Sequence, residues 1–444
     1  MGKTGASGDC KNAEGGLRMD MESMYKEALI LDELDELSSY RSKFFSGDEK
    51  LIYLDGNSLG RLPVESKAIL ERSVIIEWGE RLIRSWNEEW FTKNIELGDK
   101  IAMIAGASEG EVIVTDTTSV NLYKLAHAAL KFKEGRRRIV TDELNFPSDL
   151  YILQGLVKDF GEGYELVVVS SRDGMTIDTG DLKGKIDGNT ALVSLSHVAF
   201  KSAFRYNMKE ITALAHEKGA MVLWDLSHSI GAVPGELNES NADLAVGCTY
   251  KYLNGGPGSP AFLYVRKDLQ DKLSSPIWGW FGEKNPFDFE LKYRPGEGIR
   301  RFLAGTPPIL SLKAIEPTLD MLNEAGMDKI RKKSVSQSEF LLRLAEGFLW
   351  PLGFQPGSPL DPEKRGSHVS LRHPEAYRIC KALIDPDIGE TVVIPDFREP
   401  DNIRLGITPL YTTYTEIFTA VREIRKTVED NLFLRYSSER EQVT

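Results

Sequence analysis

Two ionisable residues stand at the ends of apolar runs that indicate buried strands. Asp225 directly follows "AMVLW", and Lys251 comes 26 residues later, between the runs "DLAVGC" and "PAFLYV". A charge in such a place costs free energy unless it is paired or reaches water. Lys251 could extend its head group to solvent, or it could act as an amine nucleophile. Asp225 could cap a helix, or it could pair with a protonated ring nitrogen of a cofactor.

A third polar segment, "TDTTSVN" at 115–121, lies between an expected strand and an expected helix. Thr118 and Ser119 stand at the helix start, where hydroxyls cap the helix and free backbone N–H groups favour an anion. Plain capping would need no ligand. A phosphate site, an aspartate and a lysine in this chain order nevertheless match what pyridoxal 5'-phosphate requires. The lysine would link to the cofactor aldehyde, and the aspartate would keep the pyridine nitrogen protonated.

The elements that must position these residues alternate between strands and helices. The strand-like runs are "LIYLD", "EVIVT", "RRIVTD", "YELVVVS", "TALVSLSHV", "GAMVLWD", "DLAVGC" and "PAFLYV". Runs with a helical period, such as "SVNLYKLAHAALKFK" and "MKEITALAHEKG", separate several of them. Fully apolar strands alternating with helices predict an α/β fold, with a mostly parallel sheet covered on both faces. Ligands bind such sheets beyond the carboxyl ends of the strands, where the polar residues above would lie.

The chain divides into four expected parts. Residues 1–20 are small and polar and are expected to form a disordered tail, although "MGKTGAS" loosely fits a myristoylation pattern. Residues 21–50 are expected to form a helical arm that packs with the smaller domain. The large domain is expected at 51–310. A smaller α+β C-terminal domain is expected at 311–444, with long helices and the short strands "HVSLR", "TVVIPD" and "NIRLGI".

Composition excludes several classes of protein. The 444 residues carry a net charge of -12 and no basic block, which argues against a nucleic-acid partner. We find neither a run of about 18 apolar residues nor a secretory signal, so we expect no membrane partner and a cytoplasmic location. Cys10, Cys248 and Cys380 lack metal-site and CxxC spacing, so we expect no metal site. "GPGSPA" (256–261) matches a dinucleotide motif by letter, but it contains Pro260 and opens no helix.

From about residue 50 to about 430, the chain resembles the kynureninases, a family of fold-type I pyridoxal-phosphate hydrolases in the class V aminotransferase-like superfamily. The resemblance lies in "YLDGNSLG" (53–60), "RLIRSWNEEW" (81–90), "TTSVNL" (117–122), "NFPSD" (145–149), "SHVAFKSAFRYNM" (196–208), "WDLSHSIGAVP" (224–234), "CTYKYLNGGPG" (248–258), "IWGWFG" (277–282), "FLAGTPPIL" (302–310) and "DFREPDNIRLGITPLY" (396–411). It implies hydrolytic Cβ–Cγ cleavage of L-kynurenine to anthranilate and L-alanine, in the kynurenine pathway of tryptophan catabolism. Cleavage of 3-hydroxykynurenine or another ring-substituted kynurenine is an alternative.

The resemblance also implies roles for cofactor residues. Lys251 would carry the cofactor and act in catalysis with Tyr250 and Asp225, and Tyr250 would transfer a proton at the substrate carbonyl or at Cβ. The other cofactor contacts would be Thr118, Ser119, Phe146, Asp149, Ser196 and His228, with Phe146 stacked on the ring. Trp280 and Thr306 would reach the phosphate from the neighbouring subunit, which implies a homodimer with shared active sites.

For the substrate, the resemblance makes Arg404 the clamp for the α-carboxylate, a task suited to a planar guanidinium. Arg372 and Arg398 are rivals for this role by sequence alone. Trp86 and Ser58 would face the aryl end. Family members that prefer the 3-hydroxylated substrate tend to carry a histidine where this chain has Trp86, so the indole favours unsubstituted kynurenine.

Three other functions compete with this interpretation. A class V aminotransferase shares the fold but does not account for the "YLDGNSLG" and "WDLSHSIGAVP" segments. A cysteine desulfurase needs a catalytic cysteine on a mobile loop, whereas Cys248 falls in an expected strand and Cys380 in an expected helix. A catalytically silent binding protein of the same fold would be indicated by loss of Lys251 or Asp225, and both are present.

Overall fold

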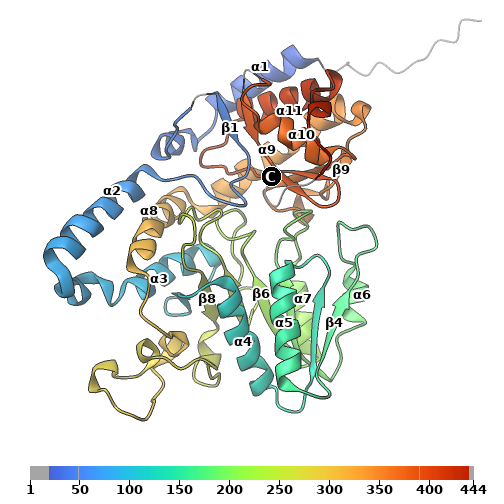
Figure 1. The fold of residues 1–444 in the computed structure, drawn as a ribbon. Coiled ribbons are helices and arrows are strands. Elements are labelled where there is room, and N and C mark those ends of the chain that lie inside the picture. The colour runs from blue at the N-terminus through green and yellow to red at the C-terminus, as the bar shows by residue number, and fades with distance from the viewer. Residues whose placement is uncertain (1–19, 49, 390, 440–444) are drawn as a thin grey trace, which may run out of the picture.

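The computed structural model describes residues 20–48, 50–389 and 391–439 (Figure 1). The segment 1–20 expected to be disordered lies outside these ranges, apart from Asp20. That residue caps helix α1 (Met21–Glu33), because its carboxylate accepts hydrogen bonds from the backbone N–H groups of Glu22 and Ser23. In the described part of the chain, no helix is both long and apolar enough to cross a membrane.

Seven strands form the central sheet, in the order β2-β8-β7-β6-β5-β3-β4. The pairs from β7 through β4 are parallel, whereas β8 runs antiparallel to both β7 and β2. The predicted mostly parallel sheet is therefore confirmed. The strands are β2 (Val112–Val114), β3 (Arg138–Asp142), β4 (Glu165–Val169), β5 (Thr190–Ser196), β6 (Met221–Asp225), β7 (Leu244–Gly247) and β8 (Phe262–Val265).

Each face of this sheet packs into its own hydrophobic cluster, which explains why the strands are apolar throughout. In β6, Met221 and Leu223 belong to one cluster, and Val222 and Trp224 to the other. The first cluster includes residues of α4 (Thr118–Phe132) and α5 (Pro147–Phe160). The second includes residues of α3 (Lys93–Ala105), α7 (Met208–Glu217) and α8 (Ile309–Ala325). Two further helices are α2 (Val64–Arg72), which packs on α8, and α6 (Thr179–Lys183).

The C-terminal part has a separate buried cluster around a four-stranded antiparallel sheet, in the order β12-β13-β10-β9. Met24 and Ala28 of α1 lie in this cluster, and Figure 1 shows α1 beside α11 although they are far apart in sequence. Strand β1 (Leu51–Tyr53) pairs in parallel with β11 (Val392–Ile394), so the chain at 51–53 also joins this part. The remaining elements are α9 (Met327–Phe348), α10 (Ala376–Ile384), α11 (Tyr414–Glu429), β9 (Gln355–Pro356), β10 (Val369–Arg372), β12 (Asp396–Arg398) and β13 (Asn402–Leu405).

Candidate active site

The carboxyl ends of neighbouring strands bring the predicted polar residues together. Ser196 ends β5 and Asp225 ends β6, and the parallel register places these two residues side by side. Lys251 follows the end of β7, the next strand of the sheet. The sequence-based expectation that these segments end at one edge of the sheet is confirmed.

Two buried carboxyl groups lie at this edge. The Asp225 carboxylate accepts hydrogen bonds from the backbone N–H of Ser227 (2.9 Å) and from its hydroxyl (2.6 Å). Burial raises the pKa of Asp225, although Ser227 and the charge of Lys251 oppose the rise. Asp149, in the first turn of α5, is also buried, and its Oδ2 has no hydrogen-bond partner among the described residues. Burial and then the nearby Asp225 raise the pKa of Asp149 well above its usual value.

Lys251 is tied to a neutral histidine. Its Nζ lies 2.8 Å from Nε2 of the buried His228. Burial and then the positive charge of Lys251 hold the pKa of His228 well below its usual value, so the imidazole is neutral. Nε2 therefore accepts a hydrogen bond from Lys251, and Nδ1 carries the ring hydrogen. That Nδ1 is buried and has no partner among the described residues.

An aromatic face and a helix start complete this group. Phe146 directly precedes α5 and is 41% exposed. The centroid of its ring lies 5.8 Å from Lys251 Nζ. Thr117 is the residue that caps α4, so Thr118 and Ser119 occupy the first two helical positions. Their backbone N–H groups have no partner within the helix. The Ser119 hydroxyl lies 2.9 Å from that of Ser148.

These features fit pyridoxal phosphate. The free N–H groups at the start of α4 suit a phosphate, and the open face of Phe146 suits a planar ring. Among the described residues Asp149 Oδ2 and His228 Nδ1 have no partner, so they offer the cofactor an acceptor and a donor. The neighbouring Asp225 can face a protonated ring nitrogen. In the described part of the chain, no group of three or more His, Cys, Asp or Glu side chains is placed to hold a metal ion.

Arg404, on β13, is fully buried. Its Nη1 donates to the Phe200 carbonyl (2.7 Å), and its Nη2 donates to the Ser58 hydroxyl (2.7 Å) and to Asp396. Nε donates to the Asn57 side-chain oxygen at 2.7 Å when the amide is turned to face it. Phe200 also contacts the Phe146 ring edge to face, with centroids 5.3 Å apart. Arg404 is thereby connected through Phe200 to the proposed cofactor face.

The two rival arginines lie in different surroundings. Arg372 pairs with Asp401 at 2.9 Å, and 42% of its side chain is exposed. Arg398 shares Asp396 with Arg404, at 2.8 Å. Arg404 is thus the arginine that the structure buries against Phe200, and Arg398 adjoins it.

The residues expected at the aryl end lie apart from one another. The Ser58 hydroxyl donates to Asp396 (3.0 Å), so Ser58 lies beside Arg404. Trp86 packs against Trp90 and against Phe281, whose ring also contacts Trp280. Trp280 and Thr306 are exposed, and within the described chain neither forms a hydrogen bond or ring contact with Lys251. Burial raises the pKa of Tyr250, next to Lys251, so its phenol keeps its proton at neutral pH.

Several residues of this site were not predicted from the sequence. Asp396 lies directly opposite Arg404 in the β12–β13 register, a pairing that the segment "DFREPDNIRL" could have indicated as a hairpin. Ser227 bonds Asp225 from two residues away, as short polar residues after a strand often do. Asn57 and the Phe200 carbonyl carry no comparable pattern, because their role depends on contacts between distant segments.

Neither described cysteine suits a desulfurase. Cys380 is buried inside helix α10, and Cys248 is buried just after β7. Cys10 lies outside the described residues. The burial of both thiols, with raised pKa values, leaves them unlike the reactive cysteine that such an enzyme needs.

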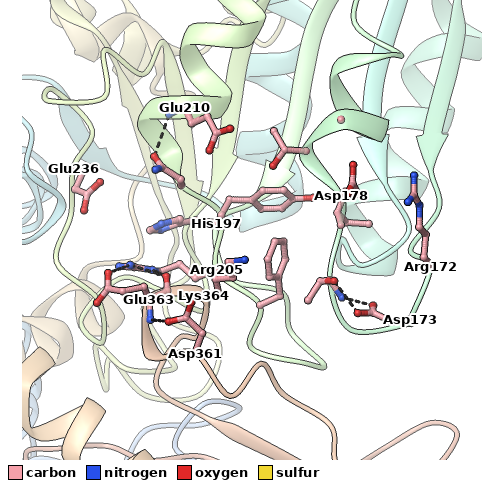
Figure 2. A pocket seen from close by; sticks show the side chains of 17 residues that line it. Arg172, Asp173, Asp178, His197, Arg205, Glu210, Glu236, Asp361, Glu363 and Lys364 are labelled. Carbon is pink, nitrogen blue, oxygen red and sulfur yellow. Dashed lines mark hydrogen bonds and ion pairs between the residues drawn. The ribbon is translucent and has the colours of Figure 1, made fainter.

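A separate cavity lies elsewhere in the molecule. This cavity, of about 780 Å³, is bounded by segments 172–180 and 204–207 and by the loop at 361–364. Figure 2 shows its mixed charges, with Arg205 held by Glu363 at the rim. It contains none of the residues predicted for the cofactor or substrate, so the group around Lys251 is the candidate active site.

Comparison with known proteins agrees with this fold. The family model "Aminotransferase class-V" matches residues 85–346. A cysteine desulfurase from Thermococcus onnurineus NA1 superposes with a TM-score of 0.73 at 20% identity, covering 90% of this chain and 98% of that one. The desulfurase CsdA from Escherichia coli also gives 0.73, at 15% identity, covering 89% and 98%. At these identities the likeness concerns the fold, and fold and site together define a class V pyridoxal-phosphate enzyme.

The chain belongs to the kynureninase family. It is 45% identical over 401 residues to a kynureninase of Pseudomonas fluorescens, covering 89% of this chain and 93% of the relative. It is 42% identical over 405 residues to a kynureninase of Burkholderia pseudomallei (strain K96243), covering 90% and 94%. The model "Kynureninase C-terminal domain" matches residues 330–424.

Proposed function

We propose that this chain is a cytoplasmic, homodimeric enzyme that uses pyridoxal phosphate to hydrolyse L-kynurenine to anthranilate and L-alanine. The observation that carries the proposal is the grouping of Lys251, His228, Asp225 and Asp149 at one sheet edge, with Arg404 connected to it through Phe200. The kynureninase relatives supply the substrate, since they match almost the whole chain.

In this proposal, Lys251 would hold the cofactor, and its amine would move the proton at the substrate Cα. When bound, pyridoxal phosphate supplies a ring that stabilises negative charge developing on the substrate carbon. Asp225 would pair with the ring nitrogen, and its negative charge would hold a proton there. The neutral His228 would donate its Nδ1–H to an oxygen of the cofactor, and Phe146 would pack against the ring.

At the other end of the reaction, water adds to the γ-carbonyl carbon, and breaking of the Cβ–Cγ bond releases the aryl acid. Tyr250 adjoins Lys251, with its ring centroid 5.8 Å from Nζ. Because burial raises the pKa of Tyr250, its phenol can donate a proton at the carbonyl oxygen or at Cβ.

Replacing Tyr250 by phenylalanine tests that role. We expect Tyr250→Phe to lower kcat by about 10²-fold with little change in KM, because a proton donor is lost while the ring remains. Steady-state kinetics would measure both constants, with the exposed Tyr151→Phe as a matched control. Full turnover in Tyr250→Phe would show that another group moves this proton.

Conservative substitution of the arginines tests the carboxylate clamp. A lysine at 404 keeps the charge but cannot present two parallel N–H donors, so we expect Arg404→Lys to raise KM by about 10- to 100-fold. The same change at Arg372, which faces Asp401, should leave KM near the wild-type value. A rise in KM for Arg372→Lys, with none for Arg404→Lys, would reverse the assignment.

The homodimer is supported by exposed aromatic surface around Trp280. Trp278, Phe287 and Phe289 are 64%, 63% and 79% exposed, although single chains rarely leave such groups in water. Trp86 contacts Phe281 in the same aromatic group. If Trp280 of one chain contributes to the site of the other, Trp86 of the same chain also lies near that site and can contact the aryl ring there.

Mixed dimers test this sharing of sites. Lys251→Ala and Trp280→Ala chains should each be weakly active alone, but a hybrid would contain one site with both residues intact. After exchange of subunits, we expect activity to recover to about a quarter of wild type, since about half the dimers are hybrids with one good site. No recovery, in mixtures shown to contain hybrids, would mean that each site is built from one chain.

The direct test of function is a product assay. Protein supplied with pyridoxal phosphate should release anthranilate and L-alanine in equal amounts from L-kynurenine, and more efficiently than it cleaves 3-hydroxy-L-kynurenine. The preference follows from Trp86, because an indole offers no hydrogen-bond acceptor to the ring hydroxyl. If neither substrate yields an aryl acid while absorbance shows cofactor bound through Lys251, the proposed reaction is wrong.

A further inference from the structure

His368 is a wholly buried imidazole without a hydrogen bond of normal geometry. It directly precedes β10, and neither ring nitrogen forms a hydrogen bond of normal geometry among the described residues, although one of them lies near the Phe200 carbonyl. Burial and then the charge of Arg404 hold the pKa of His368 well below its usual value, so the ring is neutral and has one donor and one acceptor. A buried polar group left in this state costs stability, which calls for an explanation such as a missing ligand.

The strand register aims His368 toward the substrate site. Ser370 pairs directly with Arg404 across β10 and β13, and residues two apart on a strand share a face. His368, Ser370 and Arg404 therefore lie on one face of the small sheet. Ser370 donates to the Lys201 carbonyl and Arg404 to the Phe200 carbonyl, so this face meets the loop that contacts Phe146.

The order of neighbours places His368 at the arginine end of the site. The His368 and His228 ring centroids are 5.6 Å apart. Lys251 Nζ lies 2.8 Å from His228, and His368 lies on the same face of the small sheet as Arg404. The two imidazoles thus form a row from Lys251 to Arg404. In the proposed function, the substrate α-carbon lies at Lys251 and the substrate carboxylate lies at Arg404.

We propose that His368 is a substrate-binding residue that donates a hydrogen bond to the α-carboxylate of the amino acid, beside Arg404. The inference rests on the proposed function, because it takes Arg404 as the carboxylate clamp. A neutral imidazole suits this position, since it adds a donor without adding a charge next to the buried guanidinium and Lys251. An oxygen of the carboxylate would also satisfy a nitrogen that is otherwise buried without a partner.

Binding of L-alanine and of L-alaninamide to the cofactor-loaded protein tests the proposal. The two ligands differ only in the carboxylate, and the change in cofactor absorbance reports both dissociation constants. We expect His368→Phe to weaken L-alanine by about 10- to 100-fold and L-alaninamide by much less, because the lost bond is to a charged group. His368→Gln, which keeps an N–H donor, should recover most of the affinity. The matched control is His127→Phe, since the His127 ring contacts the rings of Tyr123 and Phe160.

Other outcomes would overturn the assignment. Equal weakening of both ligands, or unchanged L-alanine affinity, would mean that His368 does not contact the carboxylate. Loss of the cofactor from both His368→Phe and His368→Gln would assign the residue to the cofactor instead. Because L-alanine has no aryl ketone, this comparison does not depend on cleavage of L-kynurenine, so failure of the proposed function would be seen separately in the product assay.

Discussion

Replacing Lys251 by alanine is expected to lower kcat for L-kynurenine by about 10⁴-fold, the largest effect of any single substitution. The change removes both the amine that holds the cofactor and the base that moves the Cα proton. It also leaves His228 Nε2 without its donor at 2.8 Å. Kinetics of anthranilate release would measure the loss, and absorbance would show whether the cofactor remains covalently linked.

The control is a lysine on the protein surface. Lys209 is 67% exposed in its side chain and only approaches Glu239, at 3.5 Å, so Lys209→Ala should leave kcat unchanged. If Lys251→Ala retained more than about a tenth of wild-type turnover, the base would have to be another residue.

The second large effect is expected at Asp225. Asp225→Asn keeps the shape of the side chain but removes the charge that faces the ring nitrogen, and we expect kcat to fall by about 10²- to 10³-fold. Asp243 offers a matched control, because it is also buried but lies just before β7, away from the site, where it holds His216 and Arg266. Asp243→Asn should leave kcat near the wild-type value even if it lowers the melting temperature.

The pKa of Asp225 provides a second test, in which the same substitution is expected to preserve or raise stability although it lowers kcat. Since burial raises this pKa above its ordinary value of 3.8, the folded protein without cofactor binds the proton more tightly than the unfolded chain does. Its ionisation therefore costs stability as pH rises above that value, and Asp149 acts in the same direction. We expect cofactor-free Asp225→Asn to melt at or above the wild-type temperature at pH 7. A markedly lower melting temperature would mean that Asp225 is a structural anion.

The sequence predicted those parts of the site that depend on local pattern. Apolar strands followed by polar residues located Asp225 and Lys251, and the helical period that begins at Thr118 located the candidate anion site. Each follows from one strand or helix and from the rule that parallel strands end at one edge. The fold class was predictable for the same reason.

What the sequence did not predict depends on contacts between distant segments. Arg404 is fixed by Asn57, Ser58 and Phe200, which come from two stretches that are distant from it in the sequence. Periodicity could not choose among Arg404, Arg372 and Arg398, because all three follow or occupy short strands of similar pattern. Likewise, His368 is an isolated histidine in the sequence, and its place on the same sheet face as Arg404 follows only from the register of β10 and β13.

The most direct measurement is cleavage of L-kynurenine in oxygen-18 water, with both products analysed by mass spectrometry. We expect anthranilate to gain a heavy oxygen in its carboxylate and L-alanine to gain none, because water adds at the γ-carbonyl carbon before the Cβ–Cγ bond breaks. Products without heavy oxygen, or an amino-group transfer that leaves the carbon skeleton intact, would contradict hydrolysis at this site.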